Sequence, residues 1–250
     1  MAVIFPFGEG STDRVVFDFL KSKIFPKTTF QNFVPVNGKD NFRTKIMQTL
    51  EGQIIPNNNL CILVFRDVDA GESPEHIVHS FRDVVWDLLD DWNLRPEIQP
   101  HRDWPNVHIC TQLPSKTTPG LHLILHLADN SALDLPTTLQ NHTTDGYVLA
   151  TGLKEVVMKR FADKIHGNAR HLHTLVTNSI PDMIRTNGSY DQDKDYLAAY
   201  LCATRFWVIH RTEEQKRLVD IILKRAWKYQ PDIIRQVFES WQVAVKEALR

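Results

Sequence analysis

The chain has 250 residues with a formal net charge of −1, and 42% of them are hydrophobic and 24% charged, which is typical of a folded globular protein with a sizeable core. No apolar stretch approaches the ~20 residues that span a bilayer and no basic segment precedes the first apolar residues, so we expect neither a membrane helix nor a signal peptide. Three widely spaced cysteines argue against a disulfide framework or a zinc site and favour a reducing, cytoplasmic compartment.

The first half of the chain alternates predicted strands and helices. Short apolar runs rich in β-branched and aromatic residues predict strands at 2–7, 28–36, 60–65, 107–113 and 121–127. Apolar residues at helical spacing predict helices at 11–20, 40–50 and 74–92, the last of which begins at a proline. Repeated strand–helix–strand units with short connections predict an α/β fold with a mainly parallel sheet flanked by helices.

Helical patterns dominate after about residue 135. We expect helices at 153–164, 194–209, 213–228 and 232–249, and a linker within 132–146. The predicted domains are therefore 1–135, an α/β domain, and 136–250, a helical C-terminal region. Residues 1–150 contain 12 basic and 18 acidic residues, whereas 151–250 contain 17 and 12. An acidic half beside a basic half suits a metal-carrying domain joined to one that attracts a polyanion, although a chance bias also explains the difference.

Two acidic strings follow directly after predicted strands. Gly8-Glu9-Gly10-Ser11-Thr12-Asp13 follows the first strand, and Asp67-Val68-Asp69-Ala70-Gly71 follows the strand at 60–65. Because neighbouring parallel strands end at the same edge of a sheet, we expect Glu9, Asp67 and Asp69 to converge there. Crowded carboxylates are the ligands that Mg²⁺ prefers, so the pattern predicts a site for Mg²⁺ or Mn²⁺. The alternative is that both strings are only turns, with Asp13 favouring the helix dipole.

These strings, in this order and context, resemble the TOPRIM domain of topoisomerases, bacterial primases and OLD-type nucleases. The resemblance covers about residues 1–130 and is closest in motif spacing to the OLD-type nucleases and to small stand-alone TOPRIM proteins. It implies that Glu9, Asp67 and Asp69 surround Mg²⁺. It also implies that Asp13, four residues after Glu9, helps to hold a second metal ion, although the nuclease pattern has Glu there. A separate ATPase partner and a role in bacterial defence or DNA repair are further implications of this likeness.

Lys116 is the candidate for a further catalytic role. OLD-type nucleases use a lysine near this region to steady the transition-state phosphate, and Lys116 is the only Lys or Arg between Arg102 and Lys154. The alternative is a solvated loop lysine. His122 and His126 share one face of a predicted strand, where we expect partly buried histidines rather than zinc ligands.

The sequence thus predicts a metal-dependent endonuclease, or a related hydrolase, that cleaves nucleic-acid phosphodiester bonds. Glu9, Asp67, Asp69 and Lys116 are the predicted catalytic residues, and Glu9, Asp13, Asp67 and Asp69 the predicted metal ligands. DNA is favoured over RNA as the partner, and the oligomeric state is left open. The alternative is a non-catalytic TOPRIM-fold module that binds a partner protein or nucleic acid.

Overall fold

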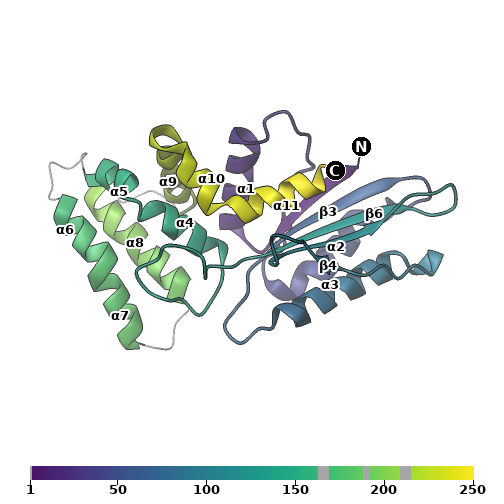
Figure 1. Cartoon of the computed structure of the whole chain (residues 1–250), viewed down its shortest axis with the longest axis horizontal. Coiled ribbons are helices and arrows are strands. Elements are labelled where there is room, and N and C mark those ends of the chain that lie inside the picture. The colour runs from purple at the N-terminus through teal and green to yellow at the C-terminus, as the bar shows by residue number, and fades with distance from the viewer. Residues whose placement is uncertain (1, 163–168, 188–191, 209–214) are drawn as a thin grey trace. The chain divides into compact units, whose positions relative to one another are not determined.

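A computed structural model describes residues 2–162, 169–187, 192–208 and 215–250 (Figure 1). The chain divides into two compact units. The first, which we call the sheet unit, comprises Met1–Ala128 and Ser240–Arg250, and the second, the helical unit, comprises Asp129–Glu239. Among the described helices, none is both long and apolar enough to cross a membrane.

The sheet unit contains a six-stranded sheet in the order β2-β1-β3-β6-β5-β4. The four strands β2, β1, β3 and β6 are parallel, whereas β5 and β4 run antiparallel to their neighbours. This confirms the predicted α/β class with a mainly parallel sheet. The strands are β1 (Val3–Gly8), β2 (Val34–Pro35), β3 (Asn59–Arg66), β4 (Gln99–Pro100), β5 (Val107–Gln112) and β6 (Gly120–Leu127).

Helices cover both faces of this sheet. Successive side chains of β3 point alternately into the two apolar layers that these helices form with the sheet. Ile62 and Val64 belong to a core cluster with residues of α2 (Phe42–Leu50) and α3 (Pro74–Leu88). Phe65, on the other face, lies 5.9 Å from Phe17 of α1 (Ser11–Lys23). It also stacks at 3.8 Å on Trp241 of α11 (Glu239–Ala248). Both faces of β3 are therefore buried, which explains its continuous apolar sequence.

Two short 3₁₀ helices, η1 (Lys39–Asn41) and η2 (Asp90–Trp92), complete the sheet unit. The helical unit is built from helices, as the pattern after residue 135 predicts. They are α4 (Thr144–Gly152), α5 (Glu155–Ala162), α6 (Ala169–Thr174), the π-helical turn η3 (Leu175–Ser179), α7 (Ile180–Asn187), α8 (Gln192–Val208), α9 (Gln215–Tyr229) and α10 (Pro231–Val237). The predicted helix ends at 163–164, 209 and 213–214 lie outside the described residues.

The C-terminal segment differs from the predicted single helix over 232–249. It forms two helices, and almost all of α11 belongs to the sheet unit. The stacking of Trp241 on Phe65 and a hydrogen bond of 2.9 Å between Ser240 Oγ and His126 Nε2 attach α11 to the sheet. The sheet unit gives way to the helical unit at Asp129. The domain boundary that we expected at 135 stays a prediction.

Candidate functional site

Two neighbouring strands of the sheet unit carry the acidic strings that the sequence singles out. The chain passes from β1 through α1 to β2 on one side of β1, and then through α2 to β3 on the other side. The strand order therefore reverses between β1 and β3, and open α/β sheets bind ligands outside the carboxyl ends of such a pair. Because Gly8 lies beside Phe65, the segments that follow β1 at Glu9 and β3 at Asp67 leave the sheet next to each other.

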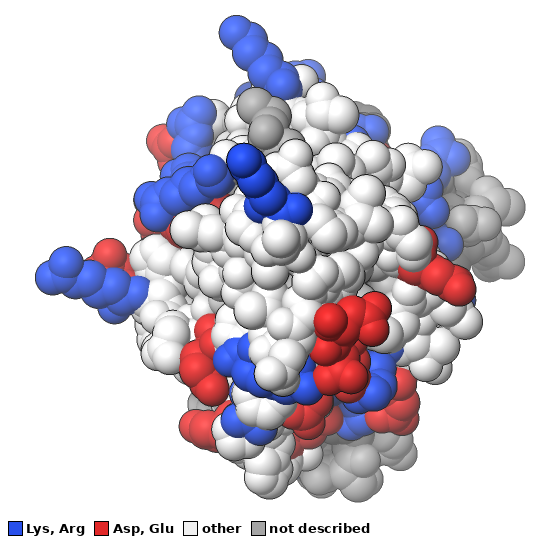
Figure 2. All heavy atoms as spheres, turned by 90° about the vertical axis from the view of Figure 1, so that its right-hand side faces the viewer, with Lys and Arg blue, Asp and Glu red and all other residues white. Residues whose placement is uncertain are grey.

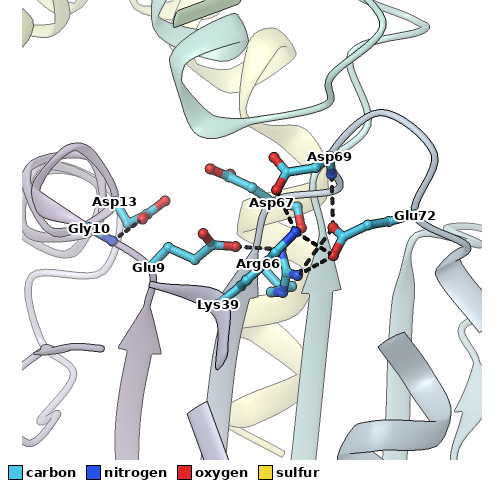
Figure 3. A network of polar contacts seen from close by, with 8 residues as sticks. All are labelled: Glu9, Gly10, Asp13, Lys39, Arg66, Asp67, Asp69 and Glu72. Carbon is cyan, nitrogen blue, oxygen red and sulfur yellow. Dashed lines mark hydrogen bonds and ion pairs between the residues drawn. The ribbon is translucent and has the colours of Figure 1, made fainter. Parts of the chain in front are cut away.

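The guanidinium of Arg66 lies at this edge and joins two carboxylates (Figure 3). Nη1 donates to Oε1 of Glu9 at 2.5 Å, and Nη2 donates to both carboxylate oxygens of Glu72 at 3.0 and 3.2 Å. Nη1 also donates to the backbone carbonyl of Asp67. The side chain of Arg66 is 6% exposed, and those of Glu9 and Glu72 are 17% and 24% exposed. These ion pairs are therefore shielded from water far more than ordinary surface pairs.

Lys39 is the second cation of the cluster, and it begins η1, directly after the short loop that follows β2. Its Nζ donates to Oδ2 of Asp69 and to Oε1 of Glu72, both at 3.0 Å. The loop is fixed because Asn37, at φ 57°, donates its N–H to the carbonyl of Glu9 at 2.9 Å. Hydrogen bonds to Asp69 and Glu72 raise the pKa of Lys39, so the ammonium stays charged.

Glu72 is held ionised by its neighbours. Burial raises the pKa of its carboxyl, but the backbone N–H of Asp69, the ammonium of Lys39 and the charge of Arg66 outweigh this effect and lower the pKa overall. The N–H of Asp69 donates to Oε2 of Glu72 at 3.0 Å. Glu72 therefore organises the loop after β3 as well as pairing with two cations.

Asp13 lies at the start of α1 and has a clear local role. Its carboxylate accepts a hydrogen bond of 2.8 Å from the N–H of Gly10, and its side chain is buried. This is the N3 half of a capping box, which satisfies one of the backbone donors at the helix start. A role for Asp13 as a ligand of a second metal ion stays a prediction.

The carboxylates do not gather as closely as the sequence predicts. Within the described part of the chain, no three His, Cys, Asp or Glu side chains form a group that could hold a metal ion. Glu9 instead bonds to Arg66, and Asp69 bonds to Lys39. The side chains are still of the type that a hard cation prefers, because Glu9, Asp67, Asp69 and Glu72 are carboxylates. Two cations, Arg66 and Lys39, lie beside these four acids. This leaves a formal charge of −2 at the edge.

Lys116 lies at the opposite end of the sheet, which corrects the prediction that it joins the acids. It follows β5, and β5 pairs antiparallel with β6, so their connecting loop lies beside the start of β3. Asn57 accordingly donates its N–H to the carbonyl of Ser115 at 3.1 Å. β3 spans eight residues from Asn59 to Arg66. At ~3.3 Å per residue, the two edges of the sheet are about 23 Å apart.

Sequence reasoning overlooked two residues of the cluster, Lys39 and Glu72. Glu72 lies three residues after Asp69 and directly before Ser73, the N-cap of α3, which is a position where acidic residues are common. Lys39 follows Asn37-Gly38, a turn that the sequence does indicate. Arg66 directly precedes Asp67 in the sequence, and in this structure it balances the charge of Glu9 and Glu72.

A cavity of about 510 Å³ opens beside the cluster, on the side of the sheet that α2 and α3 cover. Lys39, Arg66 and Glu72 line its end nearest the acids, and Arg43 and His76 line the part between the helices. The cluster is therefore accessible from a cavity of the size that small ligands occupy.

The histidines of β6 have structural partners, as expected. His126 is buried and bonded to Ser240. The ring of His122 lies 2.8 Å from the hydroxyl of Thr111 and 3.3 Å from the carbonyl of Glu247, and burial lowers its pKa.

No family model matches the chain, and no curated protein matches it significantly. Among solved structures, the chain is similar to a hypothetical protein, PH0156, from Pyrococcus horikoshii OT3. The TM-score is 0.60, 12% of the aligned residues are identical, and 99% of each chain is covered. This likeness extends over both compact units and shows the fold alone, so the resemblance to TOPRIM domains stays a prediction.

Proposed function

We propose that the edge formed by Glu9, Arg66, Asp67, Asp69 and Glu72 binds Mg²⁺ or Mn²⁺ and cleaves phosphodiester bonds of nucleic acid, with DNA favoured over RNA. One observation carries this proposal. Four carboxylates lie at the switch point of an open α/β sheet, and two cations are bonded to three of them, so these six side chains together carry a formal charge of −2. A divalent cation matches that charge.

The proposed roles follow from the donors. Glu9, Asp67 and Asp69 would be the ligands, and Asp13 would serve a second ion. A bound cation would supply a water of lowered pKa and neutralise charge on the phosphate. The ammonium of Lys39, whose side chain is 40% exposed, is a point charge at the same edge. We assign the phosphate contact to Lys39 rather than to Lys116, which lies at the other edge, because the donors of Arg66 are already bonded to Glu9 and Glu72.

The proposal is supported by the motif resemblance to TOPRIM nucleases, from which a separate ATPase partner and a role in defence or repair are also inferred. We also propose a cytoplasmic location, for which the cysteine pattern is the support.

Cleavage of plasmid, single-stranded DNA and RNA by the purified chain tests the proposal. We expect wild type to cleave at least one of them with Mg²⁺ or Mn²⁺ and none with a chelator. Asp67→Asn removes one charge with little change of shape and should slow cleavage by about 100-fold or more, because a ligand that fixes the ion is lost. Asp18→Asn is the matched control, since Asp18 is an exposed acid on α1 that pairs with Arg14. Equal cleavage by Asp67→Asn and Asp18→Asn would refute the assignment.

A second candidate is a metal-free module that binds nucleic acid or a partner protein. The bonds of Arg66 to Glu9 and Glu72 favour it, because a guanidinium there already neutralises part of the acidic charge. Calorimetry separates the two candidates. Uptake of Mg²⁺ by wild type that Asp67→Asn loses supports the metal site, whereas no uptake together with retained binding of DNA supports the module.

A further inference from the structure

A groove of about 540 Å³ lies in the sheet unit, where α2 and α3 end. The last residues of α2 and the loop after it line one side, and the end of α3 and η2 line the other. We call this surface the α2–α3 groove. It lies away from the acidic edge, because Phe42 and Ser73, where the two helices begin, line the cavity beside that edge. α3 has 15 residues, so at ~1.5 Å per residue its two ends are about 22 Å apart.

The floor of the groove is apolar. Leu50 and Leu88 belong to the core cluster of the sheet unit, and Met47 and Ile54 pack against that cluster while they remain partly exposed. Trp92 is half-buried and lines the same groove. Methionine adapts its shape to apolar partners, and tryptophan contributes strongly to binding at protein interfaces. The floor therefore offers contacts to an apolar side chain that enters the groove.

The rim of the groove is acidic. The charged residues that line it, in the part of the chain that the structure describes, are Glu51, Asp87 and Asp91. Asp87 is paired with Arg43 at 2.5 Å. Glu51 and Asp91 are exposed, and among the described residues neither forms an ion pair. Two carboxylates are therefore available to a cationic ligand.

The backbone adds negative charge to the same rim. The C-terminal end of a helix carries partial negative charge, which a Lys, Arg or His of the last turn commonly compensates. α2 and α3 are described throughout, and neither has a basic residue in its last turn. α3 runs toward the right-hand side of Figure 1, and Figure 2 shows that side with Asp and Glu side chains gathered in its lower half, beside Lys and Arg. The groove thus combines an apolar floor with a rim that favours cations.

We propose that the α2–α3 groove binds a peptide segment of another protein in which an apolar side chain is flanked by lysine or arginine. The apolar side chain packs between Met47, Ile54 and Trp92, and the flanking cations pair with Glu51 and Asp91. Charge complementarity selects this partner, since an acidic rim repels the phosphates of nucleic acid and of anionic lipids. The groove does not depend on the proposed nuclease function, because it and the acidic edge lie at opposite ends of α3.

Binding of a fluorescein-labelled peptide of about ten residues, in which leucines alternate with lysines, tests the groove by anisotropy. We expect a dissociation constant in the micromolar range at about 50 mM salt, and weaker binding as salt is added. Two further peptides carry glutamate in place of each lysine or serine in place of each leucine. Both should bind at least about tenfold more weakly, because one loses the charge pairs and the other the apolar contacts.

Variants of the rim locate the peptide. Glu51→Gln with Asp91→Asn should weaken binding of the lysine–leucine peptide by at least about fivefold, because both available carboxylates are lost. Gln48→Lys places a cation in the groove at an exposed position of α2 and should have a similar effect, which keeps the test decisive if the first pair folds poorly. The matched control is Asp18→Asn with Asp103→Asn, which changes the net charge equally at exposed positions of the sheet unit outside the groove.

The acidic edge is a competing site for a cationic peptide, so Asp67→Asn belongs to the same experiment and should bind like wild type. A loss of binding in Asp67→Asn would place the peptide at the acidic edge and overturn the groove. No binding of the lysine–leucine peptide up to about 1 mM, equal binding of the serine peptide, or equal losses in the rim variants and the control would also overturn it. If sedimentation velocity shows that wild type dimerises and Gln48→Lys does not, a second copy of the chain covers the groove and the proposed partner is wrong.

Discussion

Replacement of Arg66 by alanine should destabilise the sheet unit and make its stability depend on divalent cations. Breaking one partner of a buried ion pair costs about 3–5 kcal/mol, because a charge is left without compensation. Glu9 and Glu72 retain 17% and 24% exposure, so water compensates part of the loss. We therefore expect about 2–3 kcal/mol for Arg66→Ala in chelator. For a chain of this size, that lowers the melting temperature by about 4–12 °C.

Divalent cations should reverse this loss if the acidic edge binds them. Removal of the guanidinium changes the formal charge of the cluster from −2 to −3, which favours a cation. Mg²⁺ at about 100 times its dissociation constant would restore about 2.7 kcal/mol. Urea unfolding followed by far-ultraviolet circular dichroism, with chelator and with Mg²⁺, measures both effects.

The control is Arg95→Ala, because Arg95 pairs with Asp90 at the surface, where the two side chains are 40% and 71% exposed. Such a pair contributes about 0–1 kcal/mol. Equal losses from Arg66→Ala and Arg95→Ala would show that the Arg66 network does not stabilise the fold. A normal loss without any rescue by Mg²⁺ or Mn²⁺ would contradict the proposed cation site.

Three further predictions concern Glu72, the cysteines and Gly8. The pKa of Glu72 is lowered in the folded protein from its ordinary value of 4.5. The stability that this gives is complete above pH 4.5 and is lost as the pH falls through the pKa of the folded state. Glu72→Gln should therefore make the free energy of unfolding fall less steeply at acidic pH. Burial raises the pKa of Cys61 to about 12 and that of Cys110 to about 11, whereas Cys202 is exposed. Ellman's reagent at mildly alkaline pH should therefore react with one thiol, Cys202, in the native chain and with all three thiols in denaturant. In Gly8→Ala, the added Cβ would lie 2.5 Å from the Phe33 ring, and we expect a loss of about 1–3 kcal/mol in urea unfolding.

The parallel core of the sheet was predictable from local sequence. Strands buried on both faces have continuous apolar sequences, and β1 and β3 both show this pattern. Because parallel neighbours end at one edge, their order along the chain was enough to place Glu9 near Asp67. The short helix–strand connections fixed the direction of these strands.

The antiparallel hairpin was also indicated, but by connection length rather than by composition. Only seven residues separate the predicted strands 107–113 and 121–127, whereas a parallel crossover needs about a dozen or more. A hairpin does not say which of its two strands is parallel to β3; in the structure it is β6, so the loop that carries Lys116 lies at the edge opposite Glu9. The prediction for Lys116 was wrong because it used position along the chain and not the direction of β5.

The pairing of charges at the acidic edge depends on side-chain positions that local sequence does not fix. Lys39 lies 30 residues before Asp69, and Arg66 lies 57 residues after Glu9. Each of these pairs forms only because α2 brings the chain across the sheet and β3 lies beside β1. A run of carboxylates predicts that a positive charge is needed, but it does not say whether an arginine, a lysine or a metal ion supplies it.

The distinction between these cations has a functional consequence. A guanidinium is permanent and covalently held, so in the absence of metal it helps to lower the pKa of Glu72 and keeps its ion pair with Glu9. A metal ion binds and leaves, and its affinity depends on how much of the carboxylate charge remains uncompensated. With Arg66 and Lys39 in place the remaining charge is −2, enough for one divalent ion but not for two. An edge with this charge should therefore bind one Mg²⁺ per chain in calorimetry while Asp13 keeps its bond to Gly10, and the second ion proposed for Asp13 requires that this bond breaks.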